Sequence, residues 1–150
     1  MNKAFVRDPE PQDPTCPEPK GCGTAGIPVD KETLVAQLSD ATSQALHGQA
    51  YYCPSPGCHV AYFDAIGGIV ALDEIARPAH PKPDGAPLCH CLGVHADEII
   101  EEAKRGCRDR IRRIVAEAEQ NASRCAKKMP SGRPCATEAR RLFMAHFKPR

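Results

Sequence analysis

The stretch LCHCLGVHADEIIEEAKRGCRDRIRRI, residues 88–114, decides the fold of the second half of the chain. Apolar side chains recur every three or four residues after His95, which is the spacing of one face of an α-helix. Gly106 can end this helix, and Asp109 can cap the next one. The stretch therefore predicts two consecutive helices that follow a C-x-C pair.

The sequence on either side of this stretch divides the chain into two halves. A polar loop over 120–134 leads to a third expected helix over 135–147. On the N-terminal side, residues 77–87 contain four prolines and are expected to form a linker. We therefore expect a first unit over 1–76 and a helical unit over 88–150.

The first unit changes its periodicity along the chain. Residues 1–28 are rich in proline and glycine and are expected to form an extended loop. Asp30 suits the N-cap of a helix that runs to about Leu46. Aromatic and β-branched residues over 51–72, interrupted by glycine turns, predict two or three short strands. The predicted fold class is α+β, with a small helix and β-hairpin subdomain packed on an α-helical domain.

The composition restricts the possible function classes. The chain has 20 basic and 19 acidic residues, so no nucleic-acid footprint is expected. It has no apolar run of transmembrane length, and the N-terminal MNKAFVRDPEPQDPT lacks the apolar region of a secretory signal. No membrane insertion and a cytoplasmic location are therefore expected. Because no catalytic motif stands out, we expect a metal-binding or electron-transfer protein rather than an enzyme.

Eight of the nine cysteines fall into four close pairs. A reducing cytoplasm keeps thiols available for metals, and an odd number of cysteines does not suit a pure disulfide framework. Four thiolates complete either a tetrahedral zinc site or the frame of an iron–sulfur cluster. Two such sets, one in each half, predict two metal centres. The four pairs are Cys16/Cys22, Cys53/Cys58, Cys89/Cys91 and Cys125/Cys135.

The first set is expected to hold Zn²⁺. Cys53 and Cys58 bracket a Pro-Ser-Pro-Gly turn, so both thiols can face one point. Cys16 and Cys22 are the expected remaining ligands, and the metal would staple the N-terminal loop to the hairpin. The alternative ligands are His59 and, more weakly, Asp64. The other interpretation of this half is that its thiols are free or form disulfides.

The second set suits an iron–sulfur cluster. Cys89 and Cys91 come directly before one helix, while Cys125 and Cys135 flank the start of another. Backbone N–H groups at helix starts offset the negative charge of a thiolate-bound cluster. Basic residues surround the last two cysteines and would add to this effect: Arg124, Lys127, Lys128 and Arg133. The alternative is a solvated basic loop that carries two incidental thiols.

Residues 88–114 resemble the C-x-C-x-x-V…I…A…G motif of the bacterioferritin-associated-ferredoxin-like [2Fe-2S] domain. The resemblance implies that the C-x-C pair precedes a helix–turn–helix and that two further cysteines follow it. Carried over by position, the implied cluster ligands are Cys89, Cys91, Cys125 and Cys135. Cys107 falls in the glycine-cysteine turn of that family, which is not usually a ligand. A small buried thiol is expected there, with a redox or transient metal thiol as the alternative.

The nine residues between Cys125 and Cys135 are a longer spacing than that of the ferredoxin. This spacing resembles the N-terminal domain of CopZ-type copper chaperones, which carries both a [2Fe-2S] cluster and a zinc ion. The segment YYCPSPGCHVAYFD, residues 51–64, resembles the hairpin of the same family. This sequence lacks the Met-x-Cys-x-x-Cys loop of the copper-binding domain of those chaperones, so Cu⁺ is expected to bind only transiently.

This resemblance implies single-electron transfer in copper handling. The cluster would reduce Cu(II) to Cu(I) for delivery to a copper chaperone or a transport ATPase, with an electron donor as a further partner. Three alternatives remain open. They are a ferredoxin-like partner for iron release from bacterioferritin, a thiol-based module for copper or mercury resistance, and a structural zinc protein whose helical half binds a partner.

Overall fold

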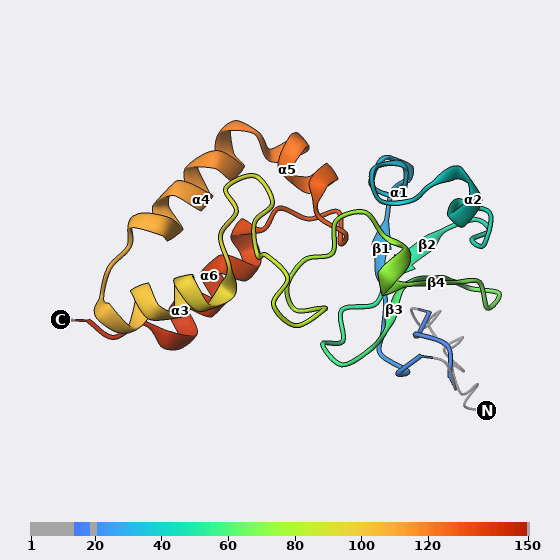
Figure 1. Cartoon of the computed structure of the whole chain (residues 1–150), viewed down its shortest axis with the longest axis horizontal. Helices are drawn as coiled ribbons and strands as arrows, with labels where there is room; N and C mark the ends of the chain where they lie inside the picture. The colour runs from blue at the N-terminus through green and yellow to red at the C-terminus, as the bar shows by residue number, and fades with distance from the viewer. Residues whose placement is uncertain (1–13, 19–20, 150) are drawn as a thin grey trace, which may run out of the picture.

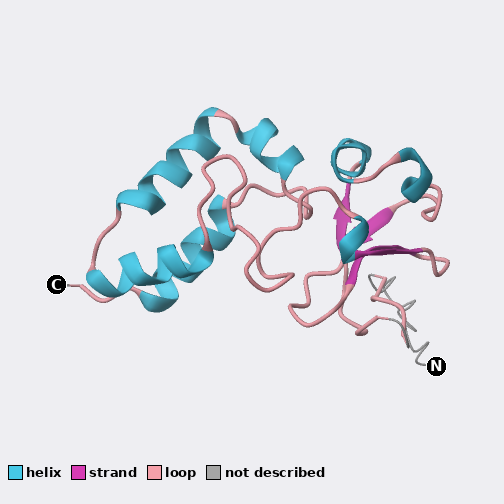
Figure 2. Cartoon of the chain, viewed as in Figure 1, coloured by secondary structure: helices cyan, strands magenta, loops and turns pink. Residues whose placement is uncertain are grey.

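The chain is described by a computed structural model that covers residues 14–18 and 21–149. A four-stranded antiparallel sheet with two short helices forms one half, and four helices form the other half (Figure 1). Long loops lie between the two halves, at the centre of the molecule (Figure 2). The α+β prediction is confirmed.

The sheet has the strand order β1-β2-β3-β4, and each strand is antiparallel to the next. Tyr52 pairs with Ile27 on one side and with Tyr62 on the other. The strands are β1 (Ile27–Val29), β2 (Ala50–Tyr52), β3 (Val60–Asp64) and β4 (Ile69–Ala71). The last three confirm the short strands predicted over 51–72. β1 lies at the end of the segment that was expected to be a loop, where it pairs with the outer edge of β2.

Every residue of β3 is buried, including Asp64 at its end. The Asp64 carboxylate accepts hydrogen bonds from the backbone N–H groups of His47, Ile66 and Gly68, at 2.8, 3.0 and 2.7 Å. Burial opposes ionisation of this carboxyl, but the three bonds outweigh burial and lower its pKa. Asp64 therefore stabilises the β3–β4 turn. This role accounts for the acidic side chain at this position, and no bound metal ion is needed to explain it.

The helix predicted from Asp30 to Leu46 is correct only in its first part. Asp30 caps α1 (Lys31–Gln37) by accepting a hydrogen bond from the Thr33 N–H at 2.8 Å. The chain then becomes extended, and Ser39 caps a separate short helix, α2 (Asp40–Ser43). A second good cap directly after the first helix offers the chain a new start, so one long helix does not form. A 3₁₀ turn, η1 (Leu72–Glu74), follows the sheet.

The second half contains the three predicted helices and one further helix. Gly106 ends the first of them with a φ of 73°, a left-handed conformation that glycine adopts readily. The helices are α3 (Ala96–Arg105), α4 (Asp109–Gln120), α5 (Ala122–Lys128) and α6 (Ala136–His146). α5 occupies part of the loop predicted over 120–134. Within the described chain, no helix has the length and apolar character needed to cross a membrane.

Buried polar side chains join the two halves. The Tyr62 hydroxyl on β3 donates a hydrogen bond to the backbone carbonyl of Pro130, in the loop after α5. The Gln37 side chain donates to the carbonyl of Lys128 at 3.2 Å and accepts from the Arg77 N–H at 2.9 Å. Both Tyr62 and Gln37 are almost fully buried. Because a buried polar group is costly unless it is bonded, these contacts favour a fixed orientation of the two halves.

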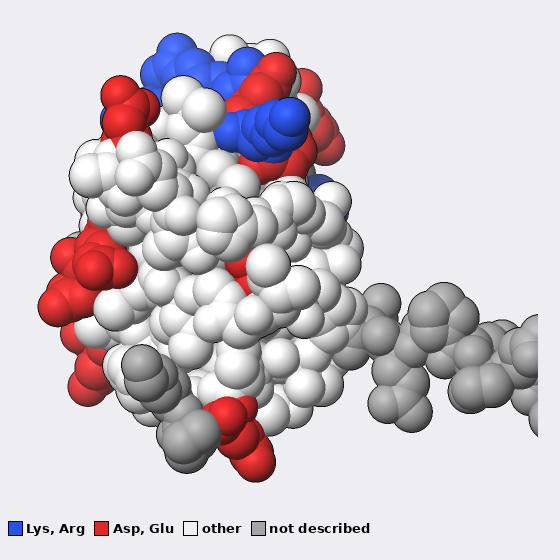
Figure 3. Space-filling view, turned by 90° about the vertical axis from the view of Figure 1, so that its right-hand side faces the viewer, with Lys and Arg blue, Asp and Glu red and all other residues white. Residues whose placement is uncertain are grey.

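The end of the molecule formed by the sheet half carries its charge at the edges. In Figure 3, Lys and Arg gather at the top of this face together with some Asp and Glu, and further Asp and Glu lie along the left side and at the bottom. Two large apolar side chains of this half are well exposed, Val35 at 79% and Ile66 at 76%. The described middle of this face is therefore largely uncharged.

Candidate metal centres

The first cysteine set consists of Cys16, Cys22, Cys53 and Cys58, and the structure brings all four together. Their Sγ atoms lie within 4.8 Å of one another. Cys16 Sγ is 3.8 Å from Cys58 Sγ, and Cys22 Sγ is 3.5 Å from Cys53 Sγ. A disulfide bond is about 2.05 Å long, so these pairs are not disulfides. The four thiols surround one point, as the sequence predicted.

The local backbone explains this convergence. Cys53 directly follows β2, and the turn back to β3 is closed by the hydrogen bond from the Cys58 N–H to the Ser55 carbonyl at 3.2 Å. On the other side, the Cys16 N–H donates to the Thr24 carbonyl at 2.8 Å. A Cβ at Gly21 would lie 2.3 Å from Cys16 Sγ, so only glycine permits this close approach.

The ionisation of the first cysteine set indicates a place for a cation. Burial raises the pKa of Cys16 to about 12 and also raises the pKa of Cys53. Burial opposes ionisation of Cys22, but hydrogen bonds with Thr24 and other neighbours together outweigh it, and the pKa of Cys22 falls to about 6. Four thiols this close cannot all ionise without a cation among them. A closed four-thiolate site of this kind fits Zn²⁺, whose tetrahedral sulfur ligands lie roughly 3.8 Å apart at Zn–S bonds of about 2.3 Å.

The two alternative zinc ligands lie outside this group. His59 is exposed and does not belong to the cluster of ligand atoms, although it follows Cys58 in sequence. Asp64 is bonded to three backbone N–H groups in the β3–β4 turn. The four cysteines are therefore the compact donor set of this half.

Lys82 is a buried cation next to the first cysteine set. It belongs to the proline-rich segment 77–87, and only 1% of its surface is exposed. Its ammonium group donates a hydrogen bond to the carbonyl of Val60 and lies 5.4 Å from the centre of the Tyr52 ring. Val60 packs in the same core cluster as Cys53, and the Lys82 charge favours the thiolate form of Cys53.

None of the ion pairs among the described residues involves Lys82. A buried ammonium group without an anionic partner costs several kcal/mol, so it favours a site that carries net negative charge. A Zn²⁺ ion with four thiolates carries a net charge of about −2. Lys82 therefore suits the role of an internal counter-ion for such a centre, which the sequence analysis missed because the segment was expected to be only a linker.

The second cysteine set consists of Cys89, Cys91, Cys125 and Cys135, and it forms two pairs. Cys91 Sγ is 3.8 Å from Cys125 Sγ, and the Cys89 and Cys135 thiols lie close enough for each to shift the pKa of the other. Cys89, Cys125 and Cys135 are buried, whereas Cys91 is half-buried. The sequence-predicted set therefore comes together, in a less compact form than the first set.

Three elements position these thiols. Backbone bonds from Leu88 and Cys89 to the Val94 carbonyl, at 2.8 and 3.1 Å, close the loop before α3. Cys125 lies on α5, and Cys135 occupies the N-cap position of α6. Cys125 thus lies on a helix, in a stretch that the sequence analysis had expected to be a loop.

The charge states of the second set also depend on their pairing. Interaction with the Cys135 thiol lowers the pKa of Cys89 to about 6, and the same contact strongly raises the pKa of Cys135. Burial, together with the neighbouring Cys91, raises the pKa of Cys125 to about 11. Of the basic residues around Cys125 and Cys135, Lys127 forms an ion pair of 3.2 Å with Glu32. A bound cation is needed to hold all four groups as thiolates.

Glu117 on α4 is a further residue of this region that the sequence analysis did not identify. One of its carboxylate oxygens and the Sγ atoms of Cys91 and Cys125 all lie within 4.8 Å of one another. Asn121 Nδ2 donates to Glu117 Oε1 at 3.1 Å. The sequence alone gives little reason to select Glu117 as a possible metal ligand, because it is one of several acidic residues on the polar side of an amphipathic helix.

Cys107 lies in the turn between α3 and α4, half-buried, where its N–H donates to the Glu102 carbonyl at 2.9 Å. It belongs to neither group of possible metal-ligating atoms in the described chain. This location fits the interpretation of Cys107 as a residue of the helix turn.

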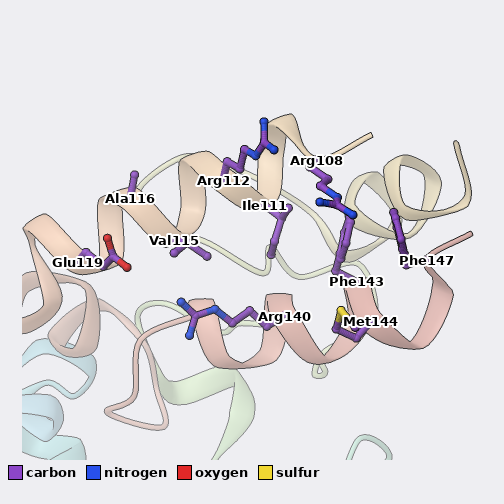
Figure 4. A pocket seen from close by; sticks show the side chains of 10 residues that line it. All are labelled: Arg108, Ile111, Arg112, Val115, Ala116, Glu119, Arg140, Phe143, Met144 and Phe147. Carbon is purple, nitrogen blue, oxygen red and sulfur yellow. The ribbon is translucent and has the colours of Figure 1, made fainter. Parts of the chain in front are cut away.

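A groove of 470 Å³ runs between α4 and α6 on the outside of the helical half (Figure 4). Its apolar lining residues include Ile111, Val115, Phe143, Met144 and Phe147. Arg108, Arg112 and Arg140 also line it, against a single acid, Glu119, and the Arg108 guanidinium lies 4.9 Å from the centre of the Phe147 ring. The groove combines an apolar floor with net positive charge.

Comparisons with known proteins agree with this organisation. Residues 13–76 match the CopZ-type family described as a zinc binding domain. Among solved structures, the X-ray structure of the Archaeoglobus fulgidus CopZ N-terminal domain is similar, with a TM-score of 0.60 and 24% sequence identity. The similarity covers 86% of this chain and 97% of that domain, and it shows a shared fold across both halves. No curated protein matches the chain.

Proposed function

We propose that the chain is an electron-transfer protein with two metal centres that acts in copper handling. In this proposal the first cysteine set holds Zn²⁺ as a structural centre, and the second cysteine set holds a [2Fe-2S] cluster as the redox centre. The observation that carries the proposal is the presence of two separate four-thiol groups of different form, one compact and one divided into two pairs.

The assignment of Zn²⁺ to the first set is supported by the match of residues 13–76 to a zinc binding domain and by its closed set of four thiols. Zn²⁺ is redox-inert, and a site with four protein ligands leaves no open position for a substrate. The role of the metal would be to link the loop around Cys16 and Cys22 to the sheet.

The counter-ion role of Lys82 gives a test of this zinc centre. Replacing Lys82 with Met keeps an unbranched chain of similar length but removes the positive charge near the thiolates. We expect zinc release by hydrogen peroxide or iodoacetamide to become faster, on the order of tenfold, because the thiolates become more nucleophilic. The release rate is measured with a coloured zinc chelator.

Lys31→Met is the matched control, since Lys31 is exposed at the start of α1 and should leave the rate unchanged. Lys82→Arg keeps the charge and should restore most of the protection. If Lys82→Met releases zinc at the wild-type rate while remaining folded, the counter-ion role is wrong.

The assignment of a [2Fe-2S] cluster to the second set is supported by its two pairs of thiols. Each iron of such a cluster takes two protein ligands, and the pairs Cys91/Cys125 and Cys89/Cys135 provide two each. When bound, the cluster supplies one electron at a time. Burial of three of the four thiols would limit access of water to it.

One electron converts one Cu(II) ion to Cu(I), so copper is a substrate of suitable stoichiometry for this centre. The proposal requires an electron donor and a protein that receives Cu(I), such as a copper chaperone or a transport ATPase. It also requires a compartment that keeps the thiols reduced, such as the cytoplasm.

The direct test is to mix the reduced iron-loaded protein, freed of excess reductant, with Cu(II) and a Cu(I)-specific chelator. We expect about one Cu(I) per chain, formed together with the return of the oxidised cluster absorption. Thiols also reduce Cu(II), so the control is the zinc-loaded protein without iron. Equal Cu(I) yields from the two preparations would contradict electron transfer by the cluster.

A further inference from the structure

We infer that Cys91, Glu117 and Cys125 form a binding site for a single divalent transition-metal ion when no cluster is bound. The site shares two thiols with the proposed cluster, but it adds a carboxylate that the cluster does not use. It concerns the iron-free state of the protein, so the inference goes beyond the proposed function; its test rests on the zinc centre proposed above but not on the [2Fe-2S] assignment.

The distances suit one metal ion. The Sγ atoms of Cys91 and Cys125 are 3.8 Å apart, which is close to the roughly 3.8 Å edge of a tetrahedral site with metal–sulfur bonds of about 2.3 Å. The carboxylate oxygen of Glu117 is within 4.8 Å of both sulfur atoms. The three ligands come from the loop before α3, from α4 and from α5, so the packing of three segments fixes their positions.

The other two thiols of the second cysteine set are almost fully buried. Cys89 and Cys135 are only 1% and 4% exposed, and neither belongs to the group of ligand atoms formed by Cys91, Glu117 and Cys125. Cys91 and Glu117 are both half-buried, so the three-ligand site is on the accessible side of the set. An ion from solution can therefore reach Cys91, Glu117 and Cys125 without separating the inner pair.

The Glu117 carboxylate is oriented for binding. Asn121, one turn further along the chain, donates to its Oε1 atom at 3.1 Å. A hydrogen bond of this kind fixes the direction of a ligating carboxylate. Glu119, two residues further on, points instead to the groove between α4 and α6 (Figure 4).

The donor set selects the class of metal. Two thiolates and one carboxylate favour Zn²⁺, Fe²⁺ or Co²⁺ over Mg²⁺ and Ca²⁺, which prefer oxygen ligands only. The fourth position would be left to water. An Fe²⁺ ion bound here would already occupy two of the four thiols proposed for the cluster, whereas a Zn²⁺ ion would block them.

The test uses the full chain prepared without iron and carrying one equivalent of Zn²⁺, with Co²⁺ as the probe. Thiolate-bound Co²⁺ gives strong near-ultraviolet absorption, so occupancy is read directly. Glu117→Gln retains the acceptor for Asn121 but weakens metal binding, and we expect a Kd at least about tenfold higher. Glu119→Gln, on the same helix, is the matched control and should bind as the wild type does.

Cysteine variants separate this site from a four-thiol site. Cys91→Ser should abolish Co²⁺ binding, while Cys89→Ser should change the Kd less than about twofold, because Cys89 is not a ligand. Equal Kd values for the wild type and Glu117→Gln, or an equal loss for Cys89→Ser and Cys91→Ser, would overturn the inference. Cluster formation is measured separately by iron loading: its failure would contradict the proposed function while leaving the Co²⁺ result unaffected.

Discussion

Replacing Cys53 with serine is expected to abolish zinc binding and unfold the sheet half. Structural zinc contributes roughly 10–16 kcal/mol in finger peptides, which exceeds the whole stability of many domains. The apolar core of this half is small, with tyrosine, valine and alanine as its main residues. Zinc content by mass spectrometry and the loss of the sheet signal in circular dichroism measure the two effects.

The control for this variant is Cys107→Ser, which changes a cysteine in the turn between α3 and α4 and should retain zinc. Adding a strong chelator to the wild type should reproduce the unfolding of the Cys53 variant. A Cys53→Ser protein that binds one zinc ion and melts like the wild type would show that the first cysteine set is not a structural metal centre.

Replacing Cys125 with serine is expected to remove the iron–sulfur cluster and leave the zinc centre intact. A serine hydroxyl is a much poorer ligand for iron than a thiolate, and Cys125 is 2% exposed, so water cannot easily replace it. The visible absorption of the iron-loaded protein should be lost almost completely, while the zinc content stays at about one per chain.

This second variant also tests the separation of the two centres. The first cysteine set belongs to the core of the sheet half, and the second borders the core of the helical half. Loss of zinc together with iron in Cys125→Ser would indicate one shared centre instead of two. Retention of the full visible absorption would exclude Cys125 as a ligand.

Much of the fold follows from local patterns in the sequence. The apolar repeat after His95 and the glycine at 106 predict α3 and α4, because helix faces and C-terminal caps depend on neighbouring residues. The break after Gln37 and the helix α5 were missed. α5 is short and polar, and it packs against α1, a contact with a distant segment that no local pattern reveals.

The cysteine sets were predictable from spacing, whereas their surroundings were not. Closely spaced pairs of cysteines can be recognised from the sequence alone, and the structure brings each predicted set together. Lys82 and Glu117 carry no such signal, since isolated charged residues are common on surfaces. Only the three-dimensional structure shows that one is buried beside the first set and that the other faces two thiols of the second.

The central claim is that this chain holds two different metal centres, and metal analysis with electron paramagnetic resonance tests it most directly. Protein isolated without oxygen should contain about two irons and about one zinc per chain, and reduction should produce a signal of about one unpaired electron per chain. A colourless protein that contains zinc alone and gives no signal after reduction would contradict the account.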